Sequence, residues 1–416
     1  MLRWNPLQEM SQIMEDMQSA VAKVQASNEA TLQQMARKER LSRPVPETMR
    51  AVVFIEPYKL EYWPKAPTPF LEEKTDVIVK VRLAAICGSD LHPYRGTEGP
   101  LDAGTVMGHE FVGEIVSCGT DVTELAVGDA VYSPFTTNCG TCFYCSEGLT
   151  CRCTKGQLFG WRQGGVGLHG GQAEYVRVPL AEATLVKKPD SLSDAEVLLL
   201  GDNLSTGYFC AMQARIKPHE VVLVIGLGPV GLLAVASALH FLDGTGAVVA
   251  VDTVEERLEI AKQLGAQPMS AADSEAVVSA VRALTDGRGA DRVLEAVGSA
   301  TTMRLAVVAV RPAGTISSVG VHAYERLPFS PIELYDKNLT ISAGRCPARH
   351  IISKSGGSGD GAAAGKTGPE AVLARFPQLA SQLMTHRLAL SEAVSAYEWS
   401  DKKQKNCVKI LLDMAL

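Results

Sequence analysis

The chain has 416 residues, of which 46% are hydrophobic, so it is long enough for two or three domains with large apolar cores. Its formal net charge of −6 and pI near 5.8 argue against nucleic acid or an anionic membrane surface as a partner. No apolar run approaches the roughly 20 residues that a membrane span requires.

Residues 1–48 form a segment of different character, which we predict to be an amphipathic helix followed by a linker. Apolar residues repeat with alternating spacings of three and four at Leu7, Met10, Met14, Met17, Val21 and Val24. The linker is the stiff run Arg43-Pro44-Val45-Pro46. Several acidic residues in the helix argue against an import signal. A docking or self-association helix and a dispensable extension both fit this pattern.

From residue 49 the sequence becomes rich in short β-type runs. Residues 50–54 and 76–81 are β-branched and apolar, and similar runs continue to about residue 190 between Pro and Gly. This texture predicts a small barrel or sandwich. We assign residues 49–206 to the first part of one domain, and residues 194–216, at its end, read as helical.

Candidate ligands for a reactive metal are spread over this region. Cys87, Ser89 and His92 lie in the motif CGSDLH after a predicted strand. His109 and Glu110 follow in GHE, and Asp202 comes much later. A zinc ion with three protein ligands and one open position binds an alcohol oxygen and lowers the pKa of its hydroxyl. Ser89 could take the released proton and pass it toward His92. Cys210 remains an alternative third ligand.

Four cysteines in the segment 136–156 have the spacing of a closed metal site. They are separated by two, two and seven residues, at Cys139, Cys142, Cys145 and Cys153. Four thiolates at such spacing are typical of structural zinc. Disulfides and an iron–sulfur cluster are the competing interpretations. Cys151 lies inside the lobe and is left over. Cysteines at metal-ligand spacing fit a reducing compartment, so we predict a cytoplasmic protein.

After Pro218 the pattern changes to alternating strands and helices. The strand Val221–Ile225 runs directly into GLGPVG, which opens a helix over 229–241 and is followed by a second strand that ends at Asp252. A G-x-G-x-x-G motif in this context indicates a dinucleotide-binding unit. Gly226 permits the tight turn and Gly228 lets the backbone approach a pyrophosphate. Gly231 allows close packing of the helix, whose N-terminus faces the phosphates.

The second strand also indicates which cofactor is bound. Asp252 can accept hydrogen bonds from the ribose hydroxyls of NAD, whereas it would repel the 2′-phosphate of NADP. Arg257 could close over the adenosine. Further strands at 291–296, 315–319 and 339–343 complete a doubly wound parallel sheet, which we assign to residues 207–346. We expect residues 347–416 to form the second part of the first domain, with a Gly-rich insertion at 354–368.

Taken together, these motifs resemble those of the zinc-dependent medium-chain alcohol dehydrogenases. The resemblance covers residues 49–416 and rests on CGSDLH, GHEFVGEIVSCG, the four-cysteine lobe, GGQAEYVRVP, STGY and GLGPVG with Asp252. It implies an α/β protein in which a GroES-like β-barrel catalytic domain is split around a Rossmann domain.

The resemblance also implies roles for individual residues. The catalytic zinc would be bound by Cys87, His109 and Asp202, with Glu110 beside it or as a transient ligand. The structural zinc would be bound by the four lobe cysteines, and Ser89 and His92 would form a proton relay. The cofactor would be contacted by Thr206, Pro229, Val230, Val297, Val319 and Val321, in addition to the glycines and Asp252. Many members have Cys where this chain has Asp202, so the chain resembles the formaldehyde-dehydrogenase-like and microbial branch.

These features lead to a functional expectation. We expect NAD and two zinc ions per chain, and hydride transfer between NAD and a small alcohol with its aldehyde or ketone. A formaldehyde- or polyol-type dehydrogenase and a catalytically silent binding protein are the alternatives. The family resemblance further implies a homo-oligomer, either a dimer or a tetramer.

Overall fold

The computed structural model describes residues 17, 21, 42–355 and 368–416. Most of the predicted N-terminal helix and of the Gly-rich insertion therefore lies outside the described residues. Of the predicted apolar seam only Met17 and Val21 are described, and their side chains are exposed. The docking role of this segment stays a prediction.

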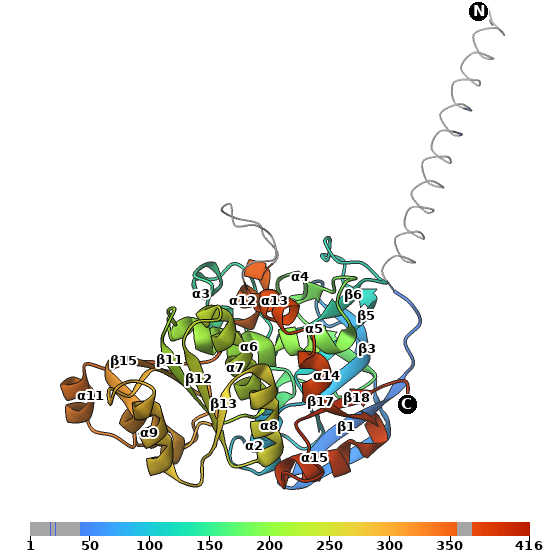
Figure 1. The fold of residues 1–416 in the computed structure, drawn as a ribbon. Coiled ribbons are helices and arrows are strands. Elements are labelled where there is room, and N and C mark those ends of the chain that lie inside the picture. The colour runs from blue at the N-terminus through green and yellow to red at the C-terminus, as the bar shows by residue number, and fades with distance from the viewer. Residues whose placement is uncertain (1–16, 18–20, 22–41, 356–367) are drawn as a thin grey trace, which may run out of the picture.

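A six-stranded parallel sheet forms the second half of the molecule, at the left of Figure 1. Its strand order is β13-β12-β11-β14-β15-β16, which is the doubly wound order that the sequence predicts. The strands are β11 (Val221–Ile225), β12 (Ala247–Asp252), β13 (Gln267–Ser270), β14 (Ala290–Glu295), β15 (Val310–Ser318) and β16 (Thr340–Ala343). The prediction missed β13, a short edge strand whose residues are largely exposed and carry little apolar pattern.

Helices cover both faces of this sheet. They are α7 (Pro229–Leu242), α8 (Glu255–Leu264), α9 (Ser274–Ala283), α10 (Ala300–Ala309) and α11 (Pro331–Lys337). Side-chain caps fix where several of them begin, because a cap oxygen accepts an otherwise unpaired backbone N–H. The hydroxyl of Ser299 accepts the N–H of Thr302, and the carboxylate of Asp273 accepts the N–H of Ala276.

The first half of the molecule contains two further sheets, a larger one ordered β10-β6-β5-β3-β18-β17, with β9 also on β3, and a smaller one ordered β2-β1-β4. Their strands are β1 (Thr48–Glu56), β2 (Lys59–Pro67), β3 (Val77–Ile86), β4 (Thr105–Val106), β5 (Glu110–Cys118), β6 (Ala130–Tyr132), β9 (Tyr175–Val178), β10 (Val186–Lys187), β17 (Met384–Ala389) and β18 (Lys409–Asp413). Because β18 pairs with β3, the C-terminal segment returns to the N-terminal sheet, as predicted. A hairpin of β7 (Trp161–Gln163) and β8 (Val166–Leu168) lies apart from both sheets.

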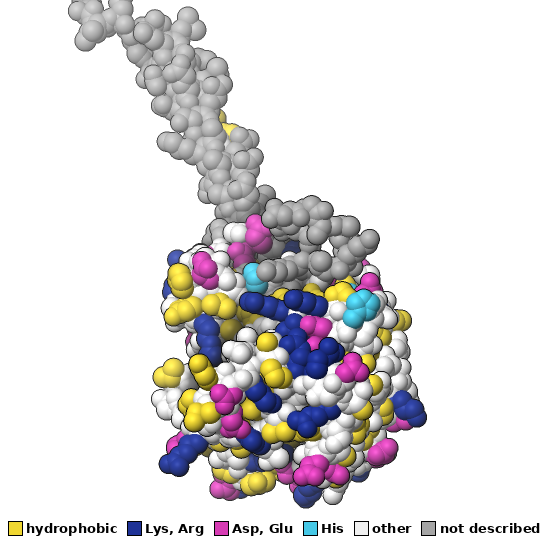
Figure 2. Space-filling model, turned by 60° about the vertical axis from the view of Figure 1, so that its left-hand side comes forward, with side chains coloured by type: hydrophobic (Ala, Val, Ile, Leu, Met, Phe, Trp, Pro, Cys, Tyr) yellow, Lys and Arg dark blue, Asp and Glu magenta, His cyan; other side chains and the backbone are white. Residues whose placement is uncertain are grey.

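Shorter helices complete the fold. They are α2 (Leu91–Tyr94), α3 (Phe143–Ser146), α4 (Ala181–Thr184), α12 (Ala348–Ser355), α13 (Pro369–Arg375), α14 (Leu379–Leu383), α15 (Ala393–Asp401), and the 3₁₀ turns at Gly88–Asp90, Thr150–Arg152 and Leu390–Glu392. Among the described residues, no helix is long and apolar enough to cross a bilayer. On the face in Figure 2, Lys and Arg side chains gather near the middle with acidic groups between and below them.

Two helices at the junction of the halves replace the single predicted helix over 194–216. They are α5 (Asp194–Gly201) and α6 (Asn203–Gln213), and the break falls at Asp202, whose φ of −141° is not helical. The predicted domain boundary after residue 206 therefore falls inside α6. A helical apolar pattern continues across the break, which explains why the sequence did not reveal it.

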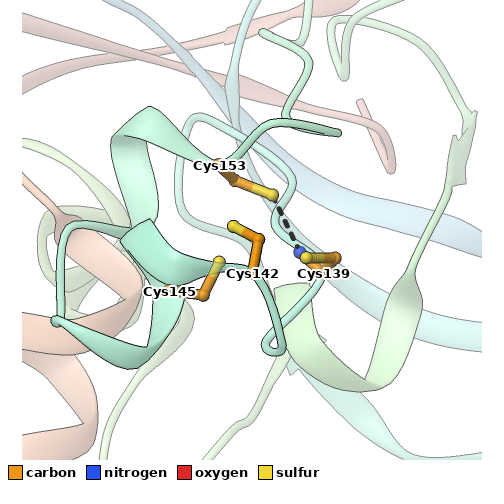
Figure 3. Close-up of side chains that lie close together, drawn as sticks. All are labelled: Cys139, Cys142, Cys145 and Cys153. Carbon is orange, nitrogen blue, oxygen red and sulfur yellow. Dashed lines mark hydrogen bonds between the residues drawn. The ribbon is translucent and has the colours of Figure 1, made fainter.

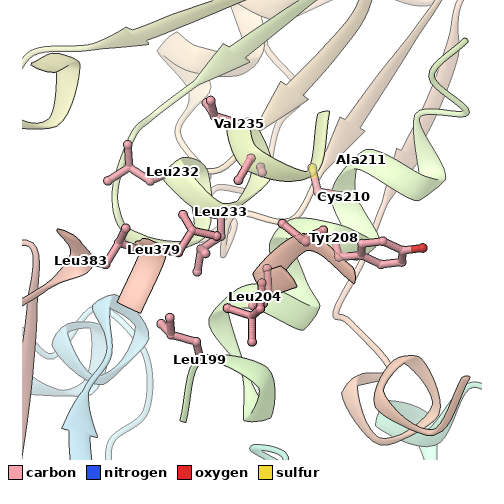
Figure 4. Packing of buried hydrophobic residues seen from close by; sticks show 14 of the residues in the cluster. Leu199, Leu204, Tyr208, Cys210, Ala211, Leu232, Leu233, Val235, Leu379 and Leu383 are labelled. Carbon is pink, nitrogen blue, oxygen red and sulfur yellow. The ribbon is translucent and has the colours of Figure 1, made fainter. Parts of the chain in front are cut away.

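The core around this break holds Asp202 in place. Leu199 and Leu204, which flank it, are fully buried and pack with Leu232 and Leu233 of α7 (Figure 4). Leu379 and Leu383 of α14 belong to the same cluster. Truncating one such buried leucine to alanine costs about 2–5 kcal/mol of stability. The position of the Asp202 carboxylate is therefore fixed by packing from both halves.

Candidate catalytic and metal-binding sites

Four buried side chains from distant parts of the sequence meet at one point. The donor atoms of Cys87, His109, Glu110 and Asp202 all lie within 4.8 Å of one another. Cys87 follows β3, His109 directly precedes β5, Glu110 begins β5, and Asp202 sits at the break between α5 and α6. Oδ2 of Asp202 is 3.5 Å from Sγ of Cys87 and 3.3 Å from Nε2 of His109. Three of the predicted ligands thus face one another directly.

Asp90 orients the histidine. Its Oδ1 lies 2.9 Å from Nδ1 of His109, and its Oδ2 accepts the backbone N–H of Cys87 at 2.9 Å. A carboxylate at Nδ1 favours the tautomer that carries the proton there, which leaves Nε2, on the side of Asp202, as the nitrogen that can bind a metal. Asp90 stands in the quoted motif CGSDLH, but sequence reasoning assigned it no role.

The carboxylate of Asp202 and the thiol of Cys87 have supporting contacts of their own. The hydroxyl of Thr206, one turn along α6, donates to Oδ1 of Asp202 at 3.2 Å. Oδ2 is thereby left to face the cluster. The side-chain amide of Asn203 points its nitrogen at Sγ of Cys87, 3.7 Å away, a contact that the sequence did not suggest. Thr206 was expected beside the nicotinamide, and the structure adds this contact with Asp202.

Glu110 is paired with Lys409, a residue that sequence reasoning missed. Glu110 begins β5 and Lys409 begins β18, the two strands that flank β3, and their side chains form an ion pair. Burial raises the pKa of Glu110 to about 7, although the Lys409 ammonium opposes this shift. The second carboxylate oxygen, Oε1, has no hydrogen-bond partner among the described residues. This oxygen remains available to a cation in the cluster.

The chemistry of this donor set fits a zinc ion. A thiol, an imidazole nitrogen and a carboxylate converge in a buried place, as in zinc sites that keep an open fourth position. Burial, followed by the carboxylates of Glu110 and Asp202, raises the pKa of Cys87, so its thiolate needs a nearby cation. Cys210, the alternative ligand, instead donates to the carbonyl of Ser317 on the parallel sheet.

The two residues of the expected proton relay lie on consecutive short turns. Oγ of Ser89 is 3.2 Å from Nε2 of His109, so its hydroxyl reaches the cluster. His92 is the second residue of the next turn, α2, is half-buried, and has Nδ1 3.5 Å from Oγ1 of Thr97. Burial lowers the pKa of His92. No direct hydrogen bond between Ser89 and His92 is seen among the described residues.

The four lobe cysteines form a second cluster (Figure 3). Their sulfur atoms lie within 4.8 Å of one another, and all ten cysteines of the chain, each in a described segment, are free of disulfides. Sulfurs around a tetrahedral zinc with bonds of about 2.3 Å lie about 3.8 Å apart, so the cluster fits one such ion. The backbone N–H of Cys139 donates to Sγ of Cys153 at 3.2 Å. Cys151 donates instead to the carbonyl of Arg345.

The glycine-rich loop after β11 has the packing that its sequence predicts. A Cβ on Gly231 would lie 1.7 Å from the carbonyl oxygen of Gly226, so only glycine permits this contact between helix and strand. Gly226 has a φ of +88°, in the region that favours glycine. Gly228 is the N-cap of α7, which begins with Pro229 and Val230, and a Cβ on Gly228 would meet no atom within 4 Å. The helix N-terminus therefore opens onto free space.

Asp252 fastens this loop to the next strand. Its Oδ2 accepts the N–H of Leu227 at 2.6 Å, and its Oδ1 accepts the N–H groups of Thr253 and Val254. Nη1 of Arg257 lies 3.7 Å from Oδ2. The carboxylate thus has a structural role at the loop in addition to the ribose contact expected of it.

Apolar side chains expected to line the cofactor cleft follow β14 and β15. Val297 and Val321 are exposed, at 44% and 38%, while Val319 is half-buried. The two segments touch, because a Cβ on Gly298 would lie 2.2 Å from the carbonyl oxygen of Val321.

A surface cavity of about 720 Å³ lies elsewhere, between α9 and α10, and none of the predicted site residues lines it.

The metal cluster and the glycine-rich loop are joined through α6 and α7. Gly207 follows Thr206 on α6, and a Cβ at this position would lie 2.9 Å from the carbonyl oxygen of Val230, in the first turn of α7. Asp202 begins α6 and Gly228 caps α7. This close helix packing places the candidate catalytic metal site next to the candidate dinucleotide site.

Two family models match the chain. The alcohol dehydrogenase GroES-like domain matches residues 73–190, and the zinc-binding dehydrogenase model matches residues 229–354. A zinc-type alcohol dehydrogenase B of Aspergillus flavus is 46% identical over 310 residues, covering 73% of this chain and 70% of the relative. A medium chain reductase/dehydrogenase of an Acremonium species is 45% identical over 298 residues, 70% of this chain and 99% of the relative.

A solved structure agrees with these sequence matches. The alcohol dehydrogenase from Thermus sp. ATN1 superposes with a TM-score of 0.76 at 37% identity, covering 88% of this chain and 99% of the other. The likeness therefore spans both halves of the molecule.

Proposed function

This chain belongs to the zinc-type alcohol dehydrogenase family, and we propose that it uses NAD to interconvert a small alcohol and its aldehyde or ketone. The observation that carries the proposal is the meeting of Cys87, His109 and Asp202 at one buried point, next to the glycine-rich loop at the start of α7. A silent relative that acts only by binding would need neither this donor set nor its supporting contacts.

In the proposed reaction, a zinc ion in the cluster would lower the pKa of the substrate hydroxyl, and NAD would accept the hydride. Cys87, His109 and Asp202 would hold the ion. Asp90 keeps the proton of His109 on Nδ1, so that Nε2 stays a ligand. Ser89 places a hydroxyl at the cluster, where it can receive the substrate proton. His92, together with the cofactor ribose, would carry that proton to solvent.

Asp252 supports the choice of NAD. Its carboxylate lies at the end of β12, and Oδ2, which accepts only one backbone N–H, retains a lone pair. A ribose hydroxyl of NAD could donate to this oxygen, whereas the 2′-phosphate of NADP would meet a negative charge. Arg257 already contacts Asp252, so its positive charge is partly engaged.

A second zinc ion in the four-cysteine lobe would be structural, because four thiolates fill all of its positions. Backbone N–H groups of Thr154 and Cys145 lower the pKa of Cys142 to about 6, which favours its thiolate form. The expected cytoplasmic location stays a prediction.

We propose further that the protein is a homo-oligomer, in which two copies pair through the edge of the parallel sheet. Among the described residues, strand β16 pairs with β15 on one side only, so its other edge is open there. Leu327, Ile332 and Tyr335, in and before the neighbouring α11, are 64%, 69% and 83% exposed. An apolar surface of this kind beside an open edge suits a second copy of the chain.

One experiment tests cofactor, chemistry and metal together. NAD and NADP reduction is measured with a panel of primary alcohols, secondary alcohols, diols, polyols and hydrated formaldehyde, and zinc is counted in the same samples. We expect two zinc ions per chain and turnover with NAD. The responding substrates decide between the general alcohol, polyol and formaldehyde readings. Two zinc ions without turnover of any substrate would contradict the proposed activity.

A further inference from the structure

We propose that Gln172 and Tyr397 are positioning residues for the catalytic metal site. They form a buried chain of hydrogen bonds that runs from the C-terminal helix α15 to the metal-binding histidine through Asp90. The inference rests on the proposed catalytic zinc, and it concerns how firmly the chain's own ligands are held.

Gln172 lies in the loop before β9 and is fully buried. Its Nε2 donates to the carbonyl oxygen of Ala85 at 3.1 Å and to Oδ2 of Asp90 at 3.3 Å, while its Oε1 accepts the hydroxyl of Tyr397 at 2.9 Å. Both Ala85 and Asp90 offer only acceptor oxygens here. Only one orientation of the amide therefore satisfies all three contacts.

The backbone at the metal site is shaped to receive this side chain. Gly108 directly precedes His109, has a φ of +88°, and a Cβ there would lie 2.4 Å from Cγ of Gln172. Any larger residue would collide with the glutamine. The backbone N–H of Gln172 also donates to the carbonyl of Met107 at 2.9 Å. Gln172 thus touches both segments that carry metal ligands, the one after β3 and the one before β5.

Tyr397 forms the other end of this chain of hydrogen bonds. It lies on α15, is fully buried, and packs against Tyr94 with ring centroids 5.6 Å apart. A buried hydroxyl is costly unless it finds a partner, and the partner here is Oε1 of Gln172. This bond prevents the glutamine amide from turning over, so its N–H groups stay on Ala85 and Asp90.

Asp90 is the point on which these contacts act. One of its oxygens holds the proton of His109, and the other receives the backbone N–H of Cys87 and the amide of Gln172. Loss of the amide donor would leave Asp90 held only by His109 and the Cys87 N–H, and both ligand segments would lose a common anchor. Removing such supporting contacts around a metal site typically costs about 10- to 100-fold in metal affinity.

The test compares zinc release from three variants of the full-length protein. Y397F removes one hydroxyl and keeps the ring. Q172E keeps an acceptor for Tyr397 but turns the donor toward Asp90 into a second carboxylate. Y94F is the matched control, because Tyr94 packs on Tyr397 while the hydroxyl of Tyr94 takes no part in the chain of hydrogen bonds from Tyr397 to Asp90. Zinc transfer to a chromogenic chelator is followed in time, and the phase that C139S abolishes is assigned to the lobe.

We expect zinc release in the remaining phase, from the catalytic site, to be about 10-fold faster in Y397F and about 100-fold faster in Q172E. Release from Y94F should match the wild type, and the lobe phase should be unchanged in all three variants. Circular dichroism shows whether each variant is folded, and Y397F alone suffices if Q172E is not. Two zinc ions in the wild type, with variant release at the wild-type rate, would overturn this inference alone. A wild type that binds only the lobe zinc would overturn the proposed function, and this inference with it.

Discussion

Lys409 and Glu110 form an ion pair in which each side chain is only 1% exposed. Lys409 stands on β18, near the C-terminus, and Glu110 follows His109 at the start of β5. The pair therefore ties the returning C-terminal segment to the candidate catalytic site. Its energetic value depends on both partners being present, because a buried charge without a partner is strongly destabilising.

We expect K409M to lower the free energy of unfolding by about 3–5 kcal/mol, because the Glu110 carboxylate would remain buried without its counter-ion. Partial protonation of Glu110, whose pKa is already raised to about 7, would moderate this loss. The double variant K409M/E110Q should recover a large part of it. Urea unfolding at pH 7.5, with all proteins loaded with zinc, measures the three values. A double variant no more stable than K409M would contradict the ion-pair argument.

The strongly patterned elements of the fold could be predicted from the sequence. The β11 strand and the helix that begins at Pro229 have continuous apolar patterns and sharp starts, so their predicted bounds agree closely with the structure. The break at Asp202 could not be predicted in this way, because leucines continue on both sides of it. Packing against α7 and α14, rather than local propensity, decides where that helix stops.

The candidate site was predictable to the extent that its residues occur in motifs. The four lobe cysteines have a spacing that indicates metal binding by itself, whereas Cys87 and His109, 22 residues apart, point to a metal only in combination with the other motifs. Lys409 lies in an apolar terminal strand, where one charged residue gives no sign of its partner. Gln172 stands inside a quoted motif, but its contacts with Asp90 and Gly108 depend on loops brought together only in the folded protein.

Asp202 provides a direct test of the catalytic metal. In D202N the side chain keeps its size and can still accept from Thr206, but it loses the charge that would face the ion. We expect the protein to stay folded, the zinc content to fall from two toward one per chain, and kcat/KM to drop by about 100-fold or more. T206V is the control for the supporting contact and should have a smaller effect. Retention of both zinc ions with full turnover in D202N would rule out Asp202 as a ligand.

His92 should determine how kcat depends on pH on the acidic side. Burial lowers its pKa from the ordinary value of 6.5, so the neutral ring, which accepts a proton, persists below pH 6.5. As pH falls through this lowered pKa, the ring becomes charged and can no longer accept, so kcat should decline there. H92Q should lose this acid limb and slow turnover at pH 7 by about 10- to 100-fold. A pH–rate profile identical to that of the wild type would remove His92 from the relay.

Loss of zinc from the four-cysteine lobe should lower the stability of the protein without directly lowering kcat. Its four thiolates leave no position for a substrate, so C139S should lose one zinc ion and lower the melting temperature, with kcat preserved in the molecules that remain folded. Cys151 offers a matched control in the same loop, because its thiol donates to the carbonyl of Arg345 and lies outside the cluster. C151S should therefore keep both zinc ions and nearly the wild-type melting temperature. Zinc content, thermal unfolding and kcat corrected for active sites separate the two cysteines, and equal zinc loss in both variants would contradict the assignment of the four ligands.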